Sequence, residues 1–394
     1  MKQQYAILAD RTFTPEGIRY QQYVRVCNGV IQEITDTAPE HCPVIRLEDR
    51  SLLPGFVDIH IHGRAGADVM DASQQGLQTI ADALVKTGVV AWVGTTVTAP
   101  MNDIKRALTQ VCEFITKPQT SGAQLVGSFL EGPYFTERHR GSHPVKYLKS
   151  PTIHELEDLM QCANHTLLRV AVAPEAEAEA EGAIEAIDWL VQHGIKTSVA
   201  HTAADFMQTS LAFSQGADCG VHLYNGMTGL HHREPGCCGA VLYHDVLAEL
   251  IADGIHVHPV MMQLAYRMKG YQRLALITDC MRAGGLPDGD YALGAQTVKV
   301  TQGQARTADG SLAGSTCSLD NALRNMVQLA HVPEWEAVQM ATSVPAQYLG
   351  IDDQFGYIRV GAQANFAVVD NNFYLTDTFI RGEHVHSVFG DTDH

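Results

Sequence analysis

The stretch of residues 54–63, Pro-Gly-Phe-Val-Asp-Ile-His-Ile-His-Gly, decides the expected fold of this chain. Its apolar, β-branched run lies between Pro54-Gly55 and Gly63, which is typical of a buried strand. His60 and His62 are two residues apart, so on an extended strand both side chains point to the same face. The stretch therefore predicts a strand with two potential metal ligands near its C-terminal end.

The same arrangement recurs at four later positions, where apolar runs end at Glu131, His201, His222 and Asp279. In a parallel α/β barrel the C-terminal ends of the strands meet on one face, where the active sites of that fold lie. Taken alone, His201 or His222 is better interpreted as a hydrogen-bonded core residue, and Glu131 could be a helix N-cap or salt-bridge partner. Together Glu131, His201 and His222 offer nitrogen and oxygen ligands and leave a fourth coordination position open, as in catalytic zinc sites. Asp279 could ligate metal, activate water or do both, so the pattern predicts a metal-dependent hydrolase.

The order of expected elements indicates one large domain and one small one. Strand-like and helical segments alternate over residues 53–345, and this length favours a closed (β/α)8 barrel of the TIM type. Residues 1–52 and 346–394 have β texture, with a hairpin turn expected at Asn28-Gly29. We expect these two terminal segments to form one small β-sandwich beside the barrel, in a fold of the α/β class. Helical periodicity predicts helices at 77–87, 103–116, 153–162, 184–193, 204–215, 259–269 and 319–330.

The composition of the 394 residues excludes several classes of partner. A formal net charge of −17 argues against a nucleic acid or an anionic membrane, although one or two basic groups suffice for a small anionic substrate. No run reaches the roughly 18 apolar residues of a membrane span, and the first residues lack the apolar core of a signal peptide. The nine cysteines are scattered and without C-x-x-C spacing, which predicts a reducing, cytoplasmic location.

Ten motifs along the chain resemble those of the amidohydrolase superfamily and, within it, of the N-acetylhexosamine-6-phosphate deacetylases. The H-x-H pair alone indicates only the superfamily, whereas REPG, IADG-x-H and LAGS in this order are specific to the deacetylases. The motifs are PGFVDIHIHG (54–63), GTTVTAP (94–100), LEGPYF (130–135), GSHP (141–144), AHTAA (200–204), HLYNGM (222–227), REPG (233–236), ADGIHVHP (252–259), TDC (278–280) and LAGS (312–315).

The resemblance implies a role for each metal-site position. It implies a divalent metal, with zinc expected as one or two ions; iron, cobalt and manganese also suit a His/carboxylate site. Asp279 matches the catalytic acid/base of the family and is also a candidate ligand. Glu131, His201 and His222 match the principal metal ligands of the family. His60 and His62 match the additional pair of ligands that is found in members able to hold two metals.

The resemblance also implies a substrate site. His256 matches the residue that contacts the acetyl carbonyl, and Arg233 is the expected phosphate ligand, because a guanidinium binds phosphate bidentately. An alternative for Arg233 is a surface salt bridge with Glu234. Members commonly form homodimers in which this arginine reaches the neighbouring site. The positions that match substrate-binding residues are Ser142, His143, Asn225, Gly226, Arg233, His256, Ala313, Gly314 and Ser315.

Two departures from the family pattern concern the sugar. Ser142 stands where alanine is usual, and Gly226 stands where many glucosamine-type members have alanine. The run 226–233, Gly-Met-Thr-Gly-Leu-His-His-Arg, is closer to the galactosamine-type deacetylases. These departures leave the configuration at C4 of the sugar open and do not affect the expected chemistry.

The expected activity is metal-dependent hydrolysis of the acetamide of N-acetylglucosamine 6-phosphate, giving glucosamine 6-phosphate and acetate. N-acetylgalactosamine 6-phosphate is the alternative substrate. Another amidohydrolase activity, on a cyclic amide or a peptide, is less well supported, because many such relatives use a carboxylated lysine where this chain has Glu131. A binding protein on a decayed barrel is disfavoured because all six candidate ligands are present.

Overall fold

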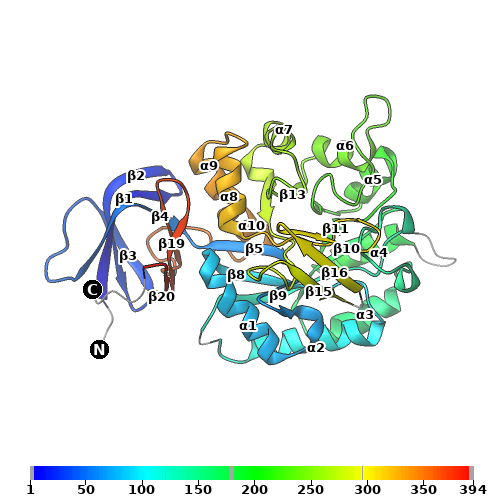
Figure 1. Cartoon of the computed structure of the whole chain (residues 1–394), viewed down its shortest axis with the longest axis horizontal. Coiled ribbons are helices and arrows are strands. Elements are labelled where there is room, and N and C mark those ends of the chain that lie inside the picture. The colour runs from blue at the N-terminus through cyan, green and yellow to red at the C-terminus, as the bar shows by residue number, and fades with distance from the viewer. Residues whose placement is uncertain (1–3, 120, 177–181, 295, 390–394) are drawn as a thin grey trace.

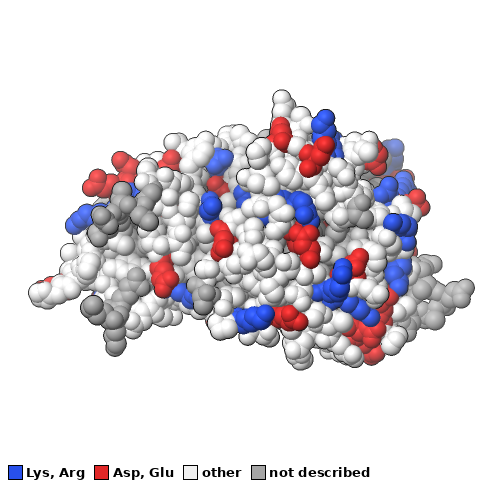
Figure 2. Space-filling view, turned by 60° about the horizontal axis from the view of Figure 1, so that its bottom comes forward, with Lys and Arg blue, Asp and Glu red and all other residues white. Residues whose placement is uncertain are grey.

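The computed structural model describes residues 4–119, 121–176, 182–294 and 296–389, and Figure 1 shows a barrel beside a smaller sheet. No helix of these residues is long and apolar enough to cross a membrane. On the face drawn in Figure 2, basic and acidic side chains are interspersed, so that face offers no single-sign surface for a polyanion.

The barrel contains eight parallel strands that follow one another in chain order around the sheet. The first and last strands meet through a bridge between Ile61 and Cys280 and a bond from Asp279 N to His60 O of 2.9 Å. The predicted (β/α)8 barrel is therefore confirmed. Its strands are β5 (Phe56–Ile61), β8 (Val89–Thr95), β9 (Gln124–Glu131), β10 (Leu167–Val172), β11 (Lys196–Val199), β12 (Cys219–Gly220), β13 (Leu247–Ile251) and β14 (Leu274–Ile277).

The seven helices predicted from periodicity all occur in the structure, and the barrel also has helices that periodicity did not predict. One of these, α6 (Gly236–Tyr243), is buried from Gly236 to Leu242, so its sequence lacks the one-sided apolar pattern of a surface helix. The others are α9 (Glu334–Ala341) and α10 (Ser343–Leu349). The predicted helices correspond to α1 (Gln74–Leu84) with η2 (Val85–Thr87), α2 (Met101–Thr116), α3 (Ile153–Ala163), α4 (Ala183–Gln192), α5 (Phe206–Ser214), α7 (Pro259–Lys269) and α8 (Leu319–Gln328).

The two ends of the chain build the smaller β domain together, as predicted. Its sheet has the order β20-β19-β18-β4-β1-β2-β3, and the Asn28-Gly29 hairpin joins β2 to β3 with positive φ at both residues. Bonds from Ile31 N to Ala362 O and from Ala364 N to Gly29 O bring the β3 edge against the chain that leads into β18, so the sheet folds over its own core. The strands are β1 (Gln4–Thr14), β2 (Gly17–Cys27), β3 (Val30–Thr35), β4 (Val44–Pro54), β18 (Phe366–Asp370), β19 (Leu375–Ile380) and β20 (Glu383–Ser387).

A small three-stranded sheet after β14 interrupts the alternation of strands and helices. It consists of β15 (Gly289–Leu293), β16 (Gln296–Thr301) and β17 (Gln304–Arg306), and it has its own small apolar core. Gln296 Nε2 donates to Ser142 O at 2.5 Å, which holds this sheet against the loop after β9. The insertion therefore lies at the C-terminal end of the barrel, where it covers part of the site. Shorter elements are β6 (Gly63–Arg64), β7 (Ala67–Asp68), η1 (Val69–Asp71), η3 (Glu137–His139), η4 (Val145–Tyr147) and η5 (Tyr271–Arg273).

Candidate active site

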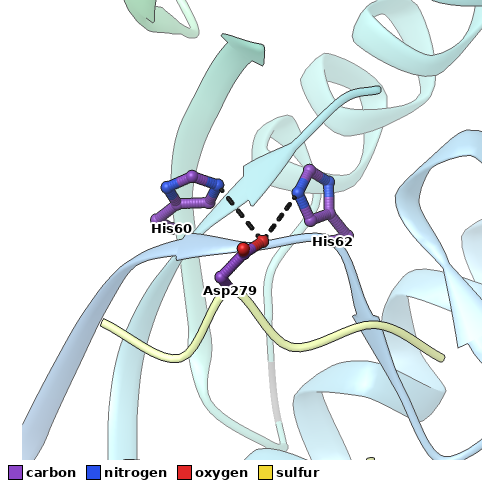
Figure 3. A group of neighbouring side chains, drawn as sticks. All are labelled: His60, His62 and Asp279. Atoms are coloured by element: carbon purple, nitrogen blue, oxygen red, sulfur yellow. Dashed lines mark ion pairs between the residues drawn. The ribbon is translucent and has the colours of Figure 1, made fainter. Parts of the chain in front are cut away.

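The six candidate metal ligands meet at the C-terminal end of the barrel. Figure 3 shows His60 on β5 and His62 directly after that strand, with Asp279 facing them from the segment after β14. Glu131 is the last residue of β9, and the remaining two ligands follow β11 and β12 by two residues each. All six are buried: His60, His62, Glu131, His201, His222 and Asp279.

Three of these residues have a backbone conformation that side chains other than glycine rarely adopt. The φ angles are 44° at His201, 33° at His222 and 48° at Asp279. Each of them turns the chain immediately after its strand and points the side chain across the barrel mouth. Such strain persists where the surrounding structure enforces it, and it concentrates at functional sites.

The Glu131 carboxylate lies at the centre of the cluster. Its Oε1 is 3.3 Å from His201 Nε2 and 3.1 Å from His222 Nε2, and its Oε2 is 3.1 Å from His62 Nε2. Asp279 Oδ1 is also 3.1 Å from His62 Nε2. Two carboxylates therefore face several imidazole nitrogens, a set of donors that would hold a cation.

The opposite ring nitrogen of each ligand histidine is held by an oxygen outside the cluster. Nδ1 of His201 is 3.0 Å from His139 O, Nδ1 of His222 is 3.0 Å from Asn225 O, and Nδ1 of His62 is 3.3 Å from Thr95 O. With the proton on Nδ1, the Nε2 lone pair points inward. Metal-ligating histidines are oriented in this way in other proteins.

The donor set fits a divalent cation. Nε2 of His201 and Nε2 of His222 are 3.1 Å apart, so with the Nδ1 proton of each ring directed outward both lone pairs point into the same space. His143 joins them, with its Nε2 3.2 Å from His201 Nε2 and its Nδ1 2.7 Å from Thr98 Oγ1. Burial is the main cause that holds the pKa of His143 well below its usual range, which keeps that ring neutral. Two groups of three residues could each hold an ion: His60, His62 and Asp279, and Glu131, His143 and His201.

The electrostatics of the cluster favour ionised carboxylates. Burial opposes ionisation of Glu131, but the neighbouring histidines outweigh it and hold the pKa of this carboxyl well below its usual range. The pKa of Asp279 is also lowered, against burial, by the hydrogen bond with His62 and by the charges of His60 and His62. Burial lowers the pKa of His62, but hydrogen bonds with both carboxylates raise it to about 10. Positive charge is therefore stabilised here, which is what a metal ion would supply.

A cavity of about 210 Å³ opens above the cluster and contains most of the expected substrate-binding positions. Ser142, His143, Asn225, Gly226, His256 and Gly314 line it beside the ligands. Ala313 and Ser315 do not line it; Ser315 N instead donates to Asp279 O at 2.7 Å and so supports the loop that carries this carboxylate.

Arg233 lies outside this cavity. It is exposed in the loop before α6, and its Nη1 is 2.6 Å from His232 Nε2. Within the described residues no ion pair joins Arg233 to Glu234, the alternative that the sequence left open. Among the described residues, no member of the REPG motif (233–236) therefore lines the cavity of its own chain.

The structure adds residues that sequence reasoning missed. Asp253 Oδ2 accepts from His256 Nδ1 at 2.7 Å, which leaves Nε2 as the ring nitrogen for the cavity. Thr98 positions His143, and Leu293 of β15 closes one side of the cavity. The sequence could have indicated Asp253, because it precedes His256 by three residues within the motif ADGIHVHP (252–259). It could not have indicated Leu293, because the place of that residue depends on the inserted sheet.

Comparisons with known proteins agree with this geometry. The sequence model of the amidohydrolase family matches residues 51–385. The chain is 42% identical over 380 residues to the N-acetylgalactosamine-6-phosphate deacetylase of Escherichia coli O157:H7, covering 96% of this chain and 98% of that protein. It is 43% identical over 357 residues to the N-acetylglucosamine-6-phosphate deacetylase of Vibrio furnissii, covering 90% and 88%.

A solved structure extends the likeness to the whole fold. N-acetyl-D-glucosamine-6-phosphate deacetylase from Mycobacterium smegmatis, in complex with N-acetyl-D-glucosamine-6-phosphate, superposes with a TM-score of 0.91. It is 29% identical and covers 98% of this chain and 100% of its own. The matched family model, the two relatives and this structure agree, and the chain belongs to the amidohydrolase family, within its N-acetylhexosamine-6-phosphate deacetylases.

Proposed function

We propose that the protein hydrolyses the acetamide of N-acetylglucosamine 6-phosphate to glucosamine 6-phosphate and acetate. The observation that carries this proposal is the buried cluster of Glu131, His201 and His222, with Asp279 facing the same cavity, in a chain that belongs to the deacetylases. The cavity of about 210 Å³ is lined by many polar side chains, which suits a small hydrophilic substrate.

The metal-site residues would hold one or two divalent cations, with zinc as the proposed metal. Glu131, His201 and His222 are the proposed principal ligands, and His60 and His62 the additional pair. When bound, such an ion lowers the pKa of water towards neutrality and polarises a carbonyl oxygen. His/carboxylate sites also accept iron, cobalt or manganese.

Asp279 is the proposed general base and acid. Its lowered pKa keeps the carboxylate ionised, ready to accept a proton from the attacking water. Water adds to the acetyl carbon, and the same proton then passes from Asp279 to the sugar nitrogen as the C–N bond breaks. The products are acetate and the free amine.

The cavity lining would orient the acetamide. Because Asp253 engages Nδ1 of His256, Nε2 is free to contact the acetyl oxygen as negative charge develops on it. Ser142, His143 and Asn225 line the cavity and are proposed to hold the sugar, together with the backbone at 226 and 313–315.

The phosphate ligand and a homodimer are proposed together. Arg233 does not line the cavity of its own chain, and we propose that the cavity of a second copy receives it. The surface around this loop is rich in exposed apolar side chains, including Met207 at 71%, Tyr243 at 75% and Val260 at 57% exposure. Exposed apolar side chains that lie together are a feature of protein interfaces. We propose that a second copy covers it and that Arg233 reaches the phosphate in the partner's site.

N-acetylgalactosamine 6-phosphate is the second candidate substrate. The Escherichia coli relative carries that name, and Gly226 matches the galactosamine-type pattern. A Cβ at position 226 would lie 2.8 Å from His201 Nδ1, so glycine keeps this side of the cavity open.

A cytoplasmic location is proposed because all nine cysteines are free, which suits a reducing compartment.

Acetate release from four sugars tests the proposal: the two N-acetylhexosamine 6-phosphates and their unphosphorylated forms. Metal content is measured on the same preparation. We expect rapid release from N-acetylglucosamine 6-phosphate and loss of activity after chelation, restored by zinc. Faster release from the galactosamine epimer would favour the second candidate, and activity on neither would refute both.

A further inference from the structure

A buried ion pair lies inside the barrel, directly below the metal-site residues. Arg169 of β10 and Glu249 of β13 are both completely buried, and Arg169 Nη2 is 2.5 Å from Glu249 Oε1. Each interrupts an otherwise apolar strand, Leu167–Val172 and Leu247–Ile251. Neither residue lines the cavity described above, so neither would touch the substrate.

The second oxygen of Glu249 contacts two of the proposed ligands. Oε2 is 2.9 Å from His60 Nδ1 and 3.4 Å from the backbone N of His222. The Nδ1 atoms of His62, His201 and His222 lie within hydrogen-bond distance of backbone carbonyl oxygens. The Nδ1 of His60 instead contacts a carboxylate. Glu249 thus connects β13 to the ends of both β5 and β12.

The free nitrogen of His60 points into the cluster without a hydrogen-bond partner. Nε2 is completely buried and lies 3.6 Å from Glu131 Oε2 and 3.6 Å from Asp279 Oδ1. With the Nδ1 proton donated to Glu249, the Nε2 lone pair faces these two carboxylates. This lone pair and the two carboxylates together favour positive charge in the space between them.

Arg169 fixes the carboxylate in turn. Its Nη1 donates to Ile59 O at 2.9 Å, its Nη2 lies 3.2 Å from Ser198 Oγ, and its guanidinium lies 4.1 Å from the centre of the Phe129 ring. Arg169 therefore holds both the carboxylate of Glu249 and the strand residue that precedes His60.

Stability alone is a poor explanation for this pair. Buried ion pairs can often be replaced by apolar residues of similar volume without loss of stability, because desolvation offsets the attraction. The specific consequence of this one is the orientation of His60. Carboxylates that hold ligand histidines in this way typically change metal affinity 10–100-fold when they are removed.

We propose that Glu249 is a positioning residue for the metal site: held in place by Arg169, it orients His60 so that Nε2 faces the cation, and it thereby sets the affinity of the ion that His60 binds. This inference rests on the proposed function only in that the cluster binds metal.

Metal titration of the chelator-stripped protein tests the inference without an activity assay. Co²⁺ binding is followed by its visible spectrum and by equilibrium dialysis in wild type, His60→Ala and Glu249→Gln. The ion of interest is the one whose affinity falls in His60→Ala. We expect Glu249→Gln to weaken the binding of this ion about 10–100-fold. The affinity for any other ion should stay within a few-fold of wild type.

The chain offers a matched control in the β domain. Asp377 is also a buried carboxylate that joins an arginine to a histidine, with Arg50 Nη1 at 2.9 Å and His384 Nε2 at 3.0 Å. Asp377→Asn should lower stability without changing either metal affinity. In a His60→Ala background, Glu249→Gln should have no further effect on metal binding, whereas a general structural role of Glu249 would still be visible.

Several results would overturn the inference. It fails if Glu249→Gln reduces the affinity for the His60-dependent ion no more than Asp377→Asn does. It also fails if Glu249→Gln reduces the affinity for all ions equally, or if His60→Ala reduces the affinity for none. A wild-type protein that binds no metal would instead refute the proposed function.

If Glu249→Gln does not fold, ¹⁵N NMR of the zinc-loaded wild type decides. His60 should show a slowly exchanging Nδ1 proton, assigned by its absence in His60→Ala. A rapidly exchanging proton, or none, would contradict the inference.

Discussion

Asp279→Asn is the substitution that isolates the proposed acid–base step. The backbone of this residue is held on both sides, by a bond from its N to His60 O of 2.9 Å and one from Ser315 N to its O of 2.7 Å. Asparagine has the same size and tolerates the left-handed conformation that φ of 48° requires. We therefore expect the loop and the cavity to keep their shape.

The size of the effect follows from the lack of a substitute base. Among the described residues that line the cavity, Glu131 is the second carboxylate, and both of its oxygens already face histidines. His256 and His143 each have Nδ1 engaged by another residue. General acid–base catalysis contributes about 10²–10⁴-fold, and without a replacement we expect kcat to fall by about 10³–10⁴-fold. This corresponds to about 4–5.5 kcal/mol in the activation free energy.

The assay is acetate release under saturating N-acetylglucosamine 6-phosphate, with KM and bound metal measured for the same preparation. Wild type should keep the ionised Asp279 down to acid pH, since its pKa is lowered, so activity should fall only on the acid side as the base becomes protonated. That acid limb should disappear in the variant. A variant within a few-fold of wild-type kcat, with its metal retained, would show that another group carries the proton.

Three further predictions concern the metal, the phosphate and stability. Glu131→Gln should lose bound metal, measured by elemental analysis, because it removes the charge that faces the ligand histidines; unchanged metal content would contradict the assigned ligands. Arg233→Ala should raise KM for the 6-phosphate sugar about 10–100-fold, the equivalent of one charge-assisted contact, and leave the unphosphorylated sugar unaffected. Mixing it with Asp279→Asn should restore activity if the arginine acts in the partner's site, and no recovery would place it in its own. The pKa of Asp377 is lowered from 3.8 to about 2, against burial, by hydrogen bonds and by the charge of Arg50. Its ionisation therefore stabilises the fold above pH 4 and loses this effect as the pH falls towards 2. Asp377→Asn should lower the unfolding free energy by about 2 kcal/mol at pH 7 and hardly at all near pH 2, as measured by denaturant titration.

Much of the barrel could be predicted from local pattern. Each strand is a short apolar run, buried on both faces, and this composition is visible without any tertiary information. The six candidate ligands were recognisable because a polar residue directly after such a run has to be satisfied in the protein interior. Helices with one apolar face, such as α2 and α8, were predicted for the same reason.

The failures have physical causes. The helix α6 is buried all round, so it carries no amphipathic period, and the sheet β15–β17 interrupts the alternation that predicted the barrel. The sequence analysis did not single out Arg169 and Glu249, and strands β10 and β13, which carry them, are not neighbours in the sheet. Their pairing depends on closure of the barrel, which no local pattern contains.

The sequence by itself determined which residues are available for chemistry and that they follow strands whose ends converge, because strand alternation and burial are encoded within a few residues of each position. Only the tertiary structure decided which nitrogen of each histidine faces the cluster, that Arg233 lies outside the cavity of its own chain, and that Glu249 supports His60 from below. These properties depend on contacts between residues up to about 190 positions apart, such as His60 and Glu249 with a separation of 189. Such contacts exist only after the barrel has closed.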